Sequence, residues 1–226
     1  QAFVQRIAGL QVIEGAAVAD GILIILYRLL AQPVEHFLAQ AGDQQAVLAG
    51  NSFGGNLAWK VAVDHPQRVS KLVLVDAAGY PFDPASMPIG FKIAQIPALR
   101  PMMEHTLPRS MIESSVRNVY GDPAKVTPEL VDRYLELTLR AGNRGALVER
   151  FRQSPSGEFT AQIPQVRQPT LILWGGQDRL IPPDNALHFQ RDIAGSRLVM
   201  FDALGHVPHE EDPAQTVAAV QDFLAP

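Results

Sequence analysis

The sequence predicts an α/β fold, in which a doubly wound, mostly parallel sheet carries an inserted helical cap. The first observation is a set of four short, nearly all-apolar runs, as expected for strands buried on both faces of a parallel sheet. These runs are Ala46–Gly50, Lys71–Asp76, Thr170–Trp174 and Arg197–Phe201. The second observation is that helical patterns alternate with such runs, which is the order of elements in a doubly wound sheet.

Three helices are expected around these runs. Phe53–His65 follows the first run and stops at Pro66, a residue that helices seldom continue through. Pro33–Ala41 precedes the same run and has one apolar stripe. The last helix has Asp212 as its N-cap and Pro213 at its first position. Its expected apolar face consists of Val217, Val220, Phe223 and Leu224.

The middle of the chain predicts helices only. Residues 81–163 contain no convincing buried strand, but they contain a capping box at 110–113 and a helix start at Thr127. We therefore expect residues 81–163 to form a helical cap, or lid, inserted into a core made of residues 1–80 and 164–226. The first part of the insertion is rich in apolar residues, which either line an apolar substrate pocket or form the cap's own core.

Composition excludes several classes of function. The net charge is −4 and no run of basic residues occurs, so we expect no nucleic acid as a partner. The chain has no cysteine, which excludes disulfides, thiolate metal sites and cysteine catalysis. The most apolar stretch, Ile22–Leu30, contains Arg28 and is far shorter than the roughly 20 residues of a membrane span. With no targeting signal visible, we expect a cytoplasmic protein; its oligomeric state is not predicted.

A serine lies between the first apolar run and the helix that follows it. The string Gly50-Asn51-Ser52-Phe53-Gly54 has the pattern G-x-S-x-G in the strand–turn–helix setting of a nucleophile elbow. We expect a tight turn that strains the serine backbone and in which side chains at positions 50 and 54 would clash. The serine hydroxyl then projects at the carboxyl edge of the sheet, and the Phe53 N–H faces a developing oxyanion. The alternative is a glycine-rich turn without chemistry, or one that binds phosphate.

A serine hydroxyl needs a base to remove its proton, and His206 is the candidate. His206 lies in a short loop directly after the last apolar run, so we expect it to reach Ser52 at the carboxyl edge. His209 is three residues further on and is expected to pack or cap near Glu210 and Glu211. A metal site made of these residues lacks a third ligand at a supporting spacing, and we expect none.

The base in turn needs an acid that fixes its tautomer. Asp178 follows the run Thr170–Trp174 and projects from the same edge of the sheet, so it is the favoured candidate. Asp76, at the end of the preceding run, is the rival. With Asp178 as the acid, the residues follow the order Ser, Asp, His that is usual in this class of fold.

Four segments resemble the α/β-hydrolase superfamily. They are VLAGNSFGG at the elbow, KLVLVDAAGYP at the next strand, PTLILWGGQDRLIP at the acid loop and GHVPHEEDP at the histidine loop. The resemblance runs from about Val34 to the C-terminus, is weaker in the cap, and points to capped bacterial esterases and to hydrolases of carbon–carbon bonds in ring-fission products. Serine at position 52, in place of aspartate, argues against the dehalogenase and epoxide-hydrolase branches.

One part of the family pattern is not found. The family places a His-Gly-containing oxyanion loop, a helix and a further strand before the elbow helix, and residues 1–32 contain nothing of this kind. Phe3–Glu14 resembles the family's opening hairpin with Ala8-Gly9 at its turn, but about 40 residues of strands, helix and loops are then expected and not found. Either a segment is missing or this is a compact relative with an impaired site. We favour the missing segment and therefore expect the chain path to be abnormal between Ala16 and Leu26.

The resemblance and the three site residues imply a serine hydrolase that cleaves a carboxylic ester of a small to medium apolar substrate through an acyl-enzyme. No cofactor or metal is implied. A carbon–carbon bond hydrolase that acts on ring-fission ketones with the same three residues is the alternative. A third possibility is a non-catalytic binding protein, for which the missing oxyanion loop is the argument.

Overall fold

The computed structural model places the parts of the chain that surround the predicted elbow and the two loops. The residues described are 5–7, 10–12, 45–81, 96, 107–144, 157 and 159–225.

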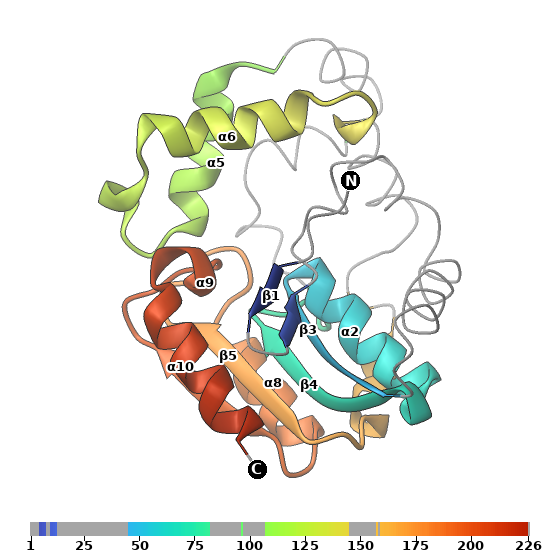
Figure 1. Cartoon of the computed structure of the whole chain (residues 1–226). Coiled ribbons are helices and arrows are strands. Elements are labelled where there is room, and N and C mark those ends of the chain that lie inside the picture. The colour runs from blue at the N-terminus through green and yellow to red at the C-terminus, as the bar shows by residue number, and fades with distance from the viewer. Residues whose placement is uncertain are drawn as a thin grey trace.

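A parallel sheet of four strands forms the centre of the described fold (Figure 1). Its strands are β3 (Ala46–Asn51), β4 (Val69–Val75), β5 (Thr170–Gly175) and β6 (Arg197–Phe201), which pair in that order. All three pairings are parallel. The four predicted strands are therefore confirmed, although β4 begins at Val69 and ends one residue before Asp76.

Helices cover both faces of this sheet, because successive strand residues point to opposite faces. Leu72 and Leu74 of β4 pack in one apolar cluster with Trp59 of α2 (Phe53–Asp64) and Phe189 of α8 (Asp184–Asp192). Val73 of β4 belongs to the other cluster, on the face covered by α10 (Pro213–Leu224). The doubly wound arrangement places the carboxyl ends of all four strands at one edge, where the predicted site residues lie.

The short helices and the hairpin complete the described elements. A short 3-10 helix, η2 (Pro66–Arg68), joins α2 to β4, and α9 (Pro208–Glu211) joins β6 to α10. Near the N-terminus, β1 (Gln5–Ile7) and β2 (Leu10–Val12) pair antiparallel, with Ile7 opposite Leu10. The expected opening hairpin around positions 8 and 9 is confirmed.

Between β4 and β5 the described residues contain helices only. These are α5 (Arg109–Val119), η5 (Pro123–Lys125), α6 (Pro128–Leu139) and η6 (Thr160–Gln165). Figure 1 shows α5 and α6 lying together, away from the sheet and nearest to α9. The Arg109 side chain joins α5 to α6, since it contacts Asp132 at 2.6 Å and the Pro128 carbonyl at 3.1 Å.

Two of the predicted helix starts are confirmed and one is wrong. Thr127 caps α6 by accepting a hydrogen bond from Leu130 N at 3.2 Å, and Asp212 caps α10 through Gln215 N at 3.1 Å. Ser110 does not begin a capping box, because α5 already begins at Arg109 with extended Pro108 as its N-cap. The proline ring fixes φ and Pro108 has no N–H, so Pro108 serves as the N-cap and the helix begins two residues earlier than the Ser–Glu spacing suggests.

The buried face of α10 keeps two of its four predicted positions, since Val217 is exposed and Leu224, although partly buried, does not belong to the sheet cluster. Val220 and Phe223 pack against the sheet cluster as expected, together with Ala219. Val217 is 42% exposed and points away, while Thr216 takes the buried place and donates its hydroxyl to the Asp212 carbonyl at 3.0 Å. The hydroxyl is satisfied by the helix's own first turn, which is why a polar residue is tolerated there.

Three expectations lie outside the described residues: the helix over 33–41, the abnormal path between 16 and 26, and the structure of 82–106 apart from residue 96. In the part of the chain that the structure describes, no helix has both the length and the apolar character needed to cross a bilayer.

Candidate active site

Ser52 occupies a strained turn between β3 and α2. Its φ is 53° and its ψ is −118°, a conformation that costs a residue with a side chain about 1–3 kcal/mol. Backbone hydrogen bonds hold the turn: Ser52 N–H donates to the Val75 carbonyl at 3.0 Å, and the Ser52 carbonyl accepts from Ala78 N at 2.9 Å. The strand and the neighbouring loop therefore fix the serine at the carboxyl edge of the sheet, and Phe53 becomes the first residue of α2.

The glycines around Ser52 have different roles from those expected. A Cβ on Gly50 would lie 2.3 Å from the Gly54 carbonyl carbon, so the clash predicted at position 50 is confirmed. The clash predicted at position 54 is wrong, because a Cβ there meets nothing within 4 Å. Gly55 is the second position that excludes a side chain, since its Cβ would lie 2.5 Å from Ala77 Cβ. Position 54 therefore faces open space, whereas position 55 lies against Ala77 in the loop after β4.

Asp178 lies in the turn after β5 and is held by its own loop. Its Oδ1 accepts hydrogen bonds from Leu180 N at 2.8 Å and from Ile181 N at 2.9 Å. Its N–H donates to the Gly175 carbonyl at 3.1 Å. The Asp178 side chain has 0% exposure, so Oδ2 is left facing the protein interior in a fixed direction.

His206 meets that free oxygen. Its Nδ1 lies 2.7 Å from Asp178 Oδ2, and the imidazole is 5% exposed. A carboxylate partner at Nδ1 places the proton on that nitrogen, which leaves Nε2 as an acceptor. The backbone is held from both sides, because His206 N–H donates to the Val119 carbonyl at 2.7 Å and the His206 carbonyl accepts from Asn51 Nδ2 at 2.9 Å.

Asn51 is the link between the serine turn and the histidine loop. It is the residue before Ser52, and its amide also donates to the Val75 carbonyl at 3.2 Å. Among the described residues, no hydrogen bond joins the Ser52 hydroxyl to His206. Such contacts are often long in enzymes without substrate and shorten in the complex. Sequence reasoning missed this role of Asn51, although its position inside the elbow motif was a signal.

Asp76, the rival acid, lies in the same buried group. Single ligand atoms of Asp76, Asp178 and His206 all lie within 4.8 Å of one another. Asp76 is 0% exposed and has φ 43°, and its Oδ1 accepts from Gly175 N at 2.9 Å. Burial, followed by the nearby Asp178 carboxylate, raises the pKa of Asp76 well above its ordinary value. The structure thus brings both candidate acids to the histidine, with Asp178 in contact with Nδ1.

The same three residues are of types that bind metal ions, but their spacing does not suit one. Two ligands of a tetrahedral zinc ion lie about 3.3 Å apart, given metal–ligand distances near 2.0–2.1 Å. His206 Nδ1 and Asp178 Oδ2 are only 2.7 Å apart, which is a hydrogen-bond distance. The arrangement is better explained as a hydrogen-bonded group.

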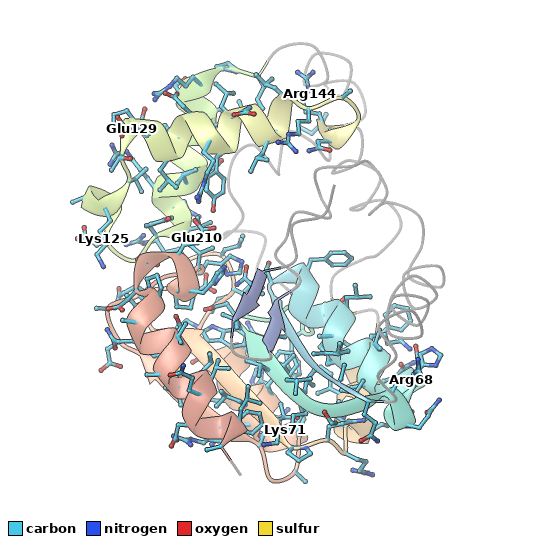
Figure 2. The ribbon with its side chains drawn as sticks, viewed as in Figure 1. Arg68, Lys71, Lys125, Glu129, Arg144 and Glu210 are labelled. Atoms are coloured by element: carbon cyan, nitrogen blue, oxygen red, sulfur yellow. The ribbon has the colours of Figure 1, made fainter. Side chains whose placement is uncertain are left out.

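The acidic residues after His206 connect the histidine loop to α5 and α6. Glu210 accepts hydrogen bonds from the Tyr120 and Tyr134 hydroxyls, each at 3.1 Å, and pairs with Arg133 at 3.0 Å. Figure 2 shows Glu210 at this junction between the two parts. Burial, followed by the charge of Glu210, raises the pKa of both tyrosines. Glu210 therefore stabilises the junction between the histidine loop and the two helices.

Glu211 holds the loop itself. Its Oε1 accepts from Gly205 N at 2.6 Å and its Oε2 from Gly121 N at 2.9 Å. His209 is exposed in α9 and is not the histidine that Asp178 contacts. The sequence pattern predicted a packing or capping role for His209 near Glu210 and Glu211, and it did not indicate that Glu211 bridges two distant segments.

The chain belongs to the family described as the alpha/beta hydrolase fold, whose pattern it matches over residues 25–213. It is a hydrolase of this fold. Among curated relatives, it is 26% identical over 201 residues to the uncharacterized hydrolase YugF of Bacillus subtilis, covering 89% of this chain and 73% of that protein. It is 30% identical over 199 residues to a 2-hydroxy-6-oxononadienedioate/2-hydroxy-6-oxononatrienedioate hydrolase of a Pseudomonas species, covering 86% of this chain and 68% of that protein.

Solved structures show the same fold. A meta-cleavage product hydrolase from Pseudomonas fluorescens superposes with a TM-score of 0.72 at 23% identity, covering 85% of this chain and 69% of that one. A thermophilic esterase from Thermogutta terrifontis gives a TM-score of 0.70 at 23% identity, covering 86% and 70%. Neighbours of both reaction types therefore share this architecture.

Proposed function

We propose that the protein is a serine hydrolase that cleaves a carboxylic ester of a small to medium apolar substrate, with Ser52 as nucleophile, His206 as base and Asp178 as the orienting acid. The observation that carries the proposal is the 2.7 Å contact between His206 Nδ1 and Asp178 Oδ2 in a loop that Asn51 ties to the strained serine turn. A buried carboxylate–imidazole pair beside a serine in this conformation is the arrangement that activates a hydroxyl.

The reaction proceeds in two halves. His206 Nε2 takes the Ser52 hydroxyl proton as Oγ bonds to the ester carbonyl carbon, and the carbonyl oxygen becomes negative. The imidazolium, stabilised by Asp178, gives the proton to the departing alcohol as the carbon–oxygen bond breaks. Water, deprotonated by the same nitrogen, then attacks the acyl-enzyme, and the acid leaves as Ser52 recovers its proton.

Phe53 supplies one donor to the oxyanion in this proposal. It is the first residue of α2, where peptide N–H groups are directed toward the helix N-terminus and favour negative charge. An oxyanion site has two donors, and loss of one costs about 100- to 1000-fold in turnover. The family carries the second donor in an oxyanion loop that has no recognisable counterpart in residues 1–32, so Phe53 is the one donor that the proposal assigns.

Residues 81–163 form the cap in this proposal, and residues 1–80 and 164–226 form the core. Support comes from α5 and α6, which lie together beyond the carboxyl edge of the sheet (Figure 1). The Val119 carbonyl at the end of α5 accepts the His206 N–H, so the cap begins at the edge of the candidate site. A cap in this place would bound the substrate and give it apolar surroundings.

Hydrolysis of a carbon–carbon bond next to a ketone is the second candidate. The observation that favours it is the likeness to proteins of that activity, among them a 2-hydroxymuconate semialdehyde hydrolase of Pseudomonas putida, at 29% identity over 204 residues. The same serine and histidine would serve, since a ketone carbonyl also passes through a negative oxygen. The leaving group would then be a carbanion stabilised by the substrate's conjugated system.

Two measurements test the proposal. A fluorophosphonate should label the protein once per chain, and Ser52→Ala should abolish the labelling, whereas Ser114→Ala on α5 should leave it unchanged. Turnover of a short-chain nitrophenyl ester and of a ring-fission diketone then ranks the two reactions. Labelling that persists in Ser52→Ala contradicts the nucleophile, and a protein that is neither labelled nor active on either substrate is a binding protein.

A further inference from the structure

Asp76 is a buried carboxyl group with one oxygen that has no hydrogen-bond partner among the described residues. Its side chain is 0% exposed, its Oδ1 accepts from Gly175 N at 2.9 Å, and its Oδ2 has no hydrogen-bond partner among the described residues. A buried carboxylate with a bare oxygen is strongly disfavoured, because it has lost water without gaining a donor. Either a proton or a donor must be present at Oδ2.

Within the described part of the chain, the groups that act on Asp76 supply no positive charge to hold it ionised. Those that act on it are Asp178 from the loop after β5, His206 from the loop after β6, and Glu211 from α9. Both carboxylates are negative, and His206 is directed to Asp178 through Nδ1. Burial, followed by the charge of Asp178, raises the pKa of Asp76 well above its ordinary value. Two carboxyl groups this close cannot both ionise easily, so one proton remains between them.

The proton belongs on Asp76. Asp178 Oδ1 already accepts two backbone N–H groups and its Oδ2 faces His206 Nδ1, so both of its oxygens already have donors. Asp76 has a single backbone donor, at Oδ1. A proton on Asp76 Oδ2 would satisfy the leftover oxygen and would find an Asp178 oxygen as its acceptor.

We propose that Asp76 is a positioning residue of the site: a neutral carboxylic acid whose Oδ2–H donates to Asp178 and holds that carboxylate against His206 Nδ1. The inference rests on the proposed function, since it gives the orienting acid a support of its own. No bond to substrate is involved and no proton leaves the pair during turnover. The hydrogen bond from Asp76 draws some negative charge away from Asp178. Asp178 therefore still stabilises the His206 imidazolium, but not so strongly that the imidazolium fails to release its proton.

Asp76→Asn and Asp76→Gly form the test pair. Asparagine keeps an oxygen for Gly175 N and a neutral N–H for Asp178, and it tolerates the positive φ of 43°. Glycine adopts the same backbone conformation but removes both the acceptor for Gly175 N and the donor to Asp178. Loss of a hydrogen bond to a charged group corresponds to about 10- to 100-fold, so kcat should fall by that factor in Asp76→Gly and by about threefold or less in Asp76→Asn.

The pH profile separates positioning from mere folding. Without its donor, Asp178 is more negative and holds the imidazolium more tightly, so the acid limb of kcat/KM should move to higher pH in Asp76→Gly and little in Asp76→Asn. Equal losses of kcat in the two variants would overturn the proposal, because the carboxyl itself would then be needed. Wild-type kcat and pH profile in both variants would overturn it too, because Asp76 would then be structural only.

An infrared measurement tests the proton without catalysis. The difference spectrum between the wild-type protein and Asp76→Asn at neutral pH should contain the carbonyl stretch of a neutral carboxylic acid. A difference spectrum with only carboxylate bands overturns the proposal, even if Asp76→Gly does not fold. If fluorophosphonate fails to label wild-type Ser52, the proposed function fails, and the infrared band still decides the state of Asp76.

Discussion

Gly121 and Gly205 lie backbone against backbone: a Cβ on Gly205 would be 2.4 Å from Gly121 N, and one on Gly121 would be 2.7 Å from Gly205 N. Gly121 follows α5, and Gly205 precedes His206. The Glu211 carboxylate accepts both N–H groups, and Arg179 donates to the Gly121 carbonyl at 3.2 Å. The end of α5 and the histidine loop are therefore one packed unit.

Glu211→Gln should loosen this unit. An amide NH₂ would replace one of the two acceptor oxygens and face a backbone N–H, so we expect the free energy of unfolding to fall by about 1–3 kcal/mol. Turnover should fall as well, because the loop carries His206. Asp222→Asn is the control, since it breaks only the exposed ion pair with Arg197 and should cost less than about 1 kcal/mol. Denaturant unfolding measures both, and equal effects would contradict the bridging role.

The glycines of the serine turn offer a matched pair of substitutions. Gly50→Ala places a Cβ 2.3 Å from the Gly54 backbone, which has no flexible atom to give way. We expect Gly50→Ala to lower the melting temperature strongly and to abolish fluorophosphonate labelling. Gly54→Ala meets open space and should be tolerated. A stable, labelled Gly50→Ala protein would show that the turn is wider than described.

Asp178→Asn should leave the fold intact and strongly lower kcat. The amide presents its NH₂ or its oxygen to His206 Nδ1 and no longer fixes the tautomer, and the comparable change in a serine protease triad costs about ten thousandfold in kcat. Asp202→Asn changes an exposed aspartate at the same edge of the sheet and should leave kcat within about twofold of wild type. Steady-state kinetics on the nitrophenyl ester check both, and a mild effect of Asp178→Asn would shift the orienting role to Asp76.

The contributions of Asp76 and Asp192 to the free energy of unfolding should change with pH in opposite directions. The pKa of Asp76 is raised above its ordinary value of 3.8 by burial, so its contribution is complete below about pH 4 and is lost as pH rises. The unfolding free energy of wild type relative to Asp76→Asn should therefore decline with pH, at up to about 1.4 kcal/mol per unit. This decline begins near pH 3.8, the ordinary pKa, and ends near the raised pKa of Asp76 in the folded protein.

Asp192 is the control of opposite sign. Hydrogen bonds from Arg191 and then Tyr80 lower the pKa of Asp192, so its contribution is present above pH 4 and is lost in acid. Stability relative to Asp192→Asn should therefore rise with pH below about pH 4 and stay flat above it, whereas stability relative to Asp76→Asn should be flat below about pH 4 and decline above it. Urea unfolding at several pH values measures both differences. A flat difference for Asp76→Asn would mean that Asp76 titrates alike in the folded and unfolded chain.

The sheet and the site residues were predictable because each depends on a local signal. Four apolar runs and a G-x-S-x-G string between a strand and a helix are visible without any tertiary contact. Strand ends in a parallel sheet meet at one edge, so the positions of Asp178 and His206 at that edge were predictable, while Asp76 remained a rival there. The three-residue site is now supported by the contact between these two side chains, and its catalytic role remains the proposal tested above.

Other features depend on contacts that no local pattern encodes. Gly55 and Gly54 are indistinguishable in the string, and only the approach of Ala77 decides which must be glycine. Glu211 reaches Gly121 across 90 positions of the chain. The pairing of Asp76 with Asp178 depends on how far two neighbouring loops turn inward, which is a matter of packing.

In the proposed mechanism, the positive φ at Ser52 means that catalysis and folding stability favour different residues at this position. A glycine there would adopt the same turn without strain, so the best residue for catalysis is a poor one for stability. Selection for heat resistance alone, with no requirement for turnover, should therefore replace Ser52 early and leave the surrounding sheet untouched. Under the proposed mechanism, a serine that survives such a selection for heat resistance would show that turnover was still being selected.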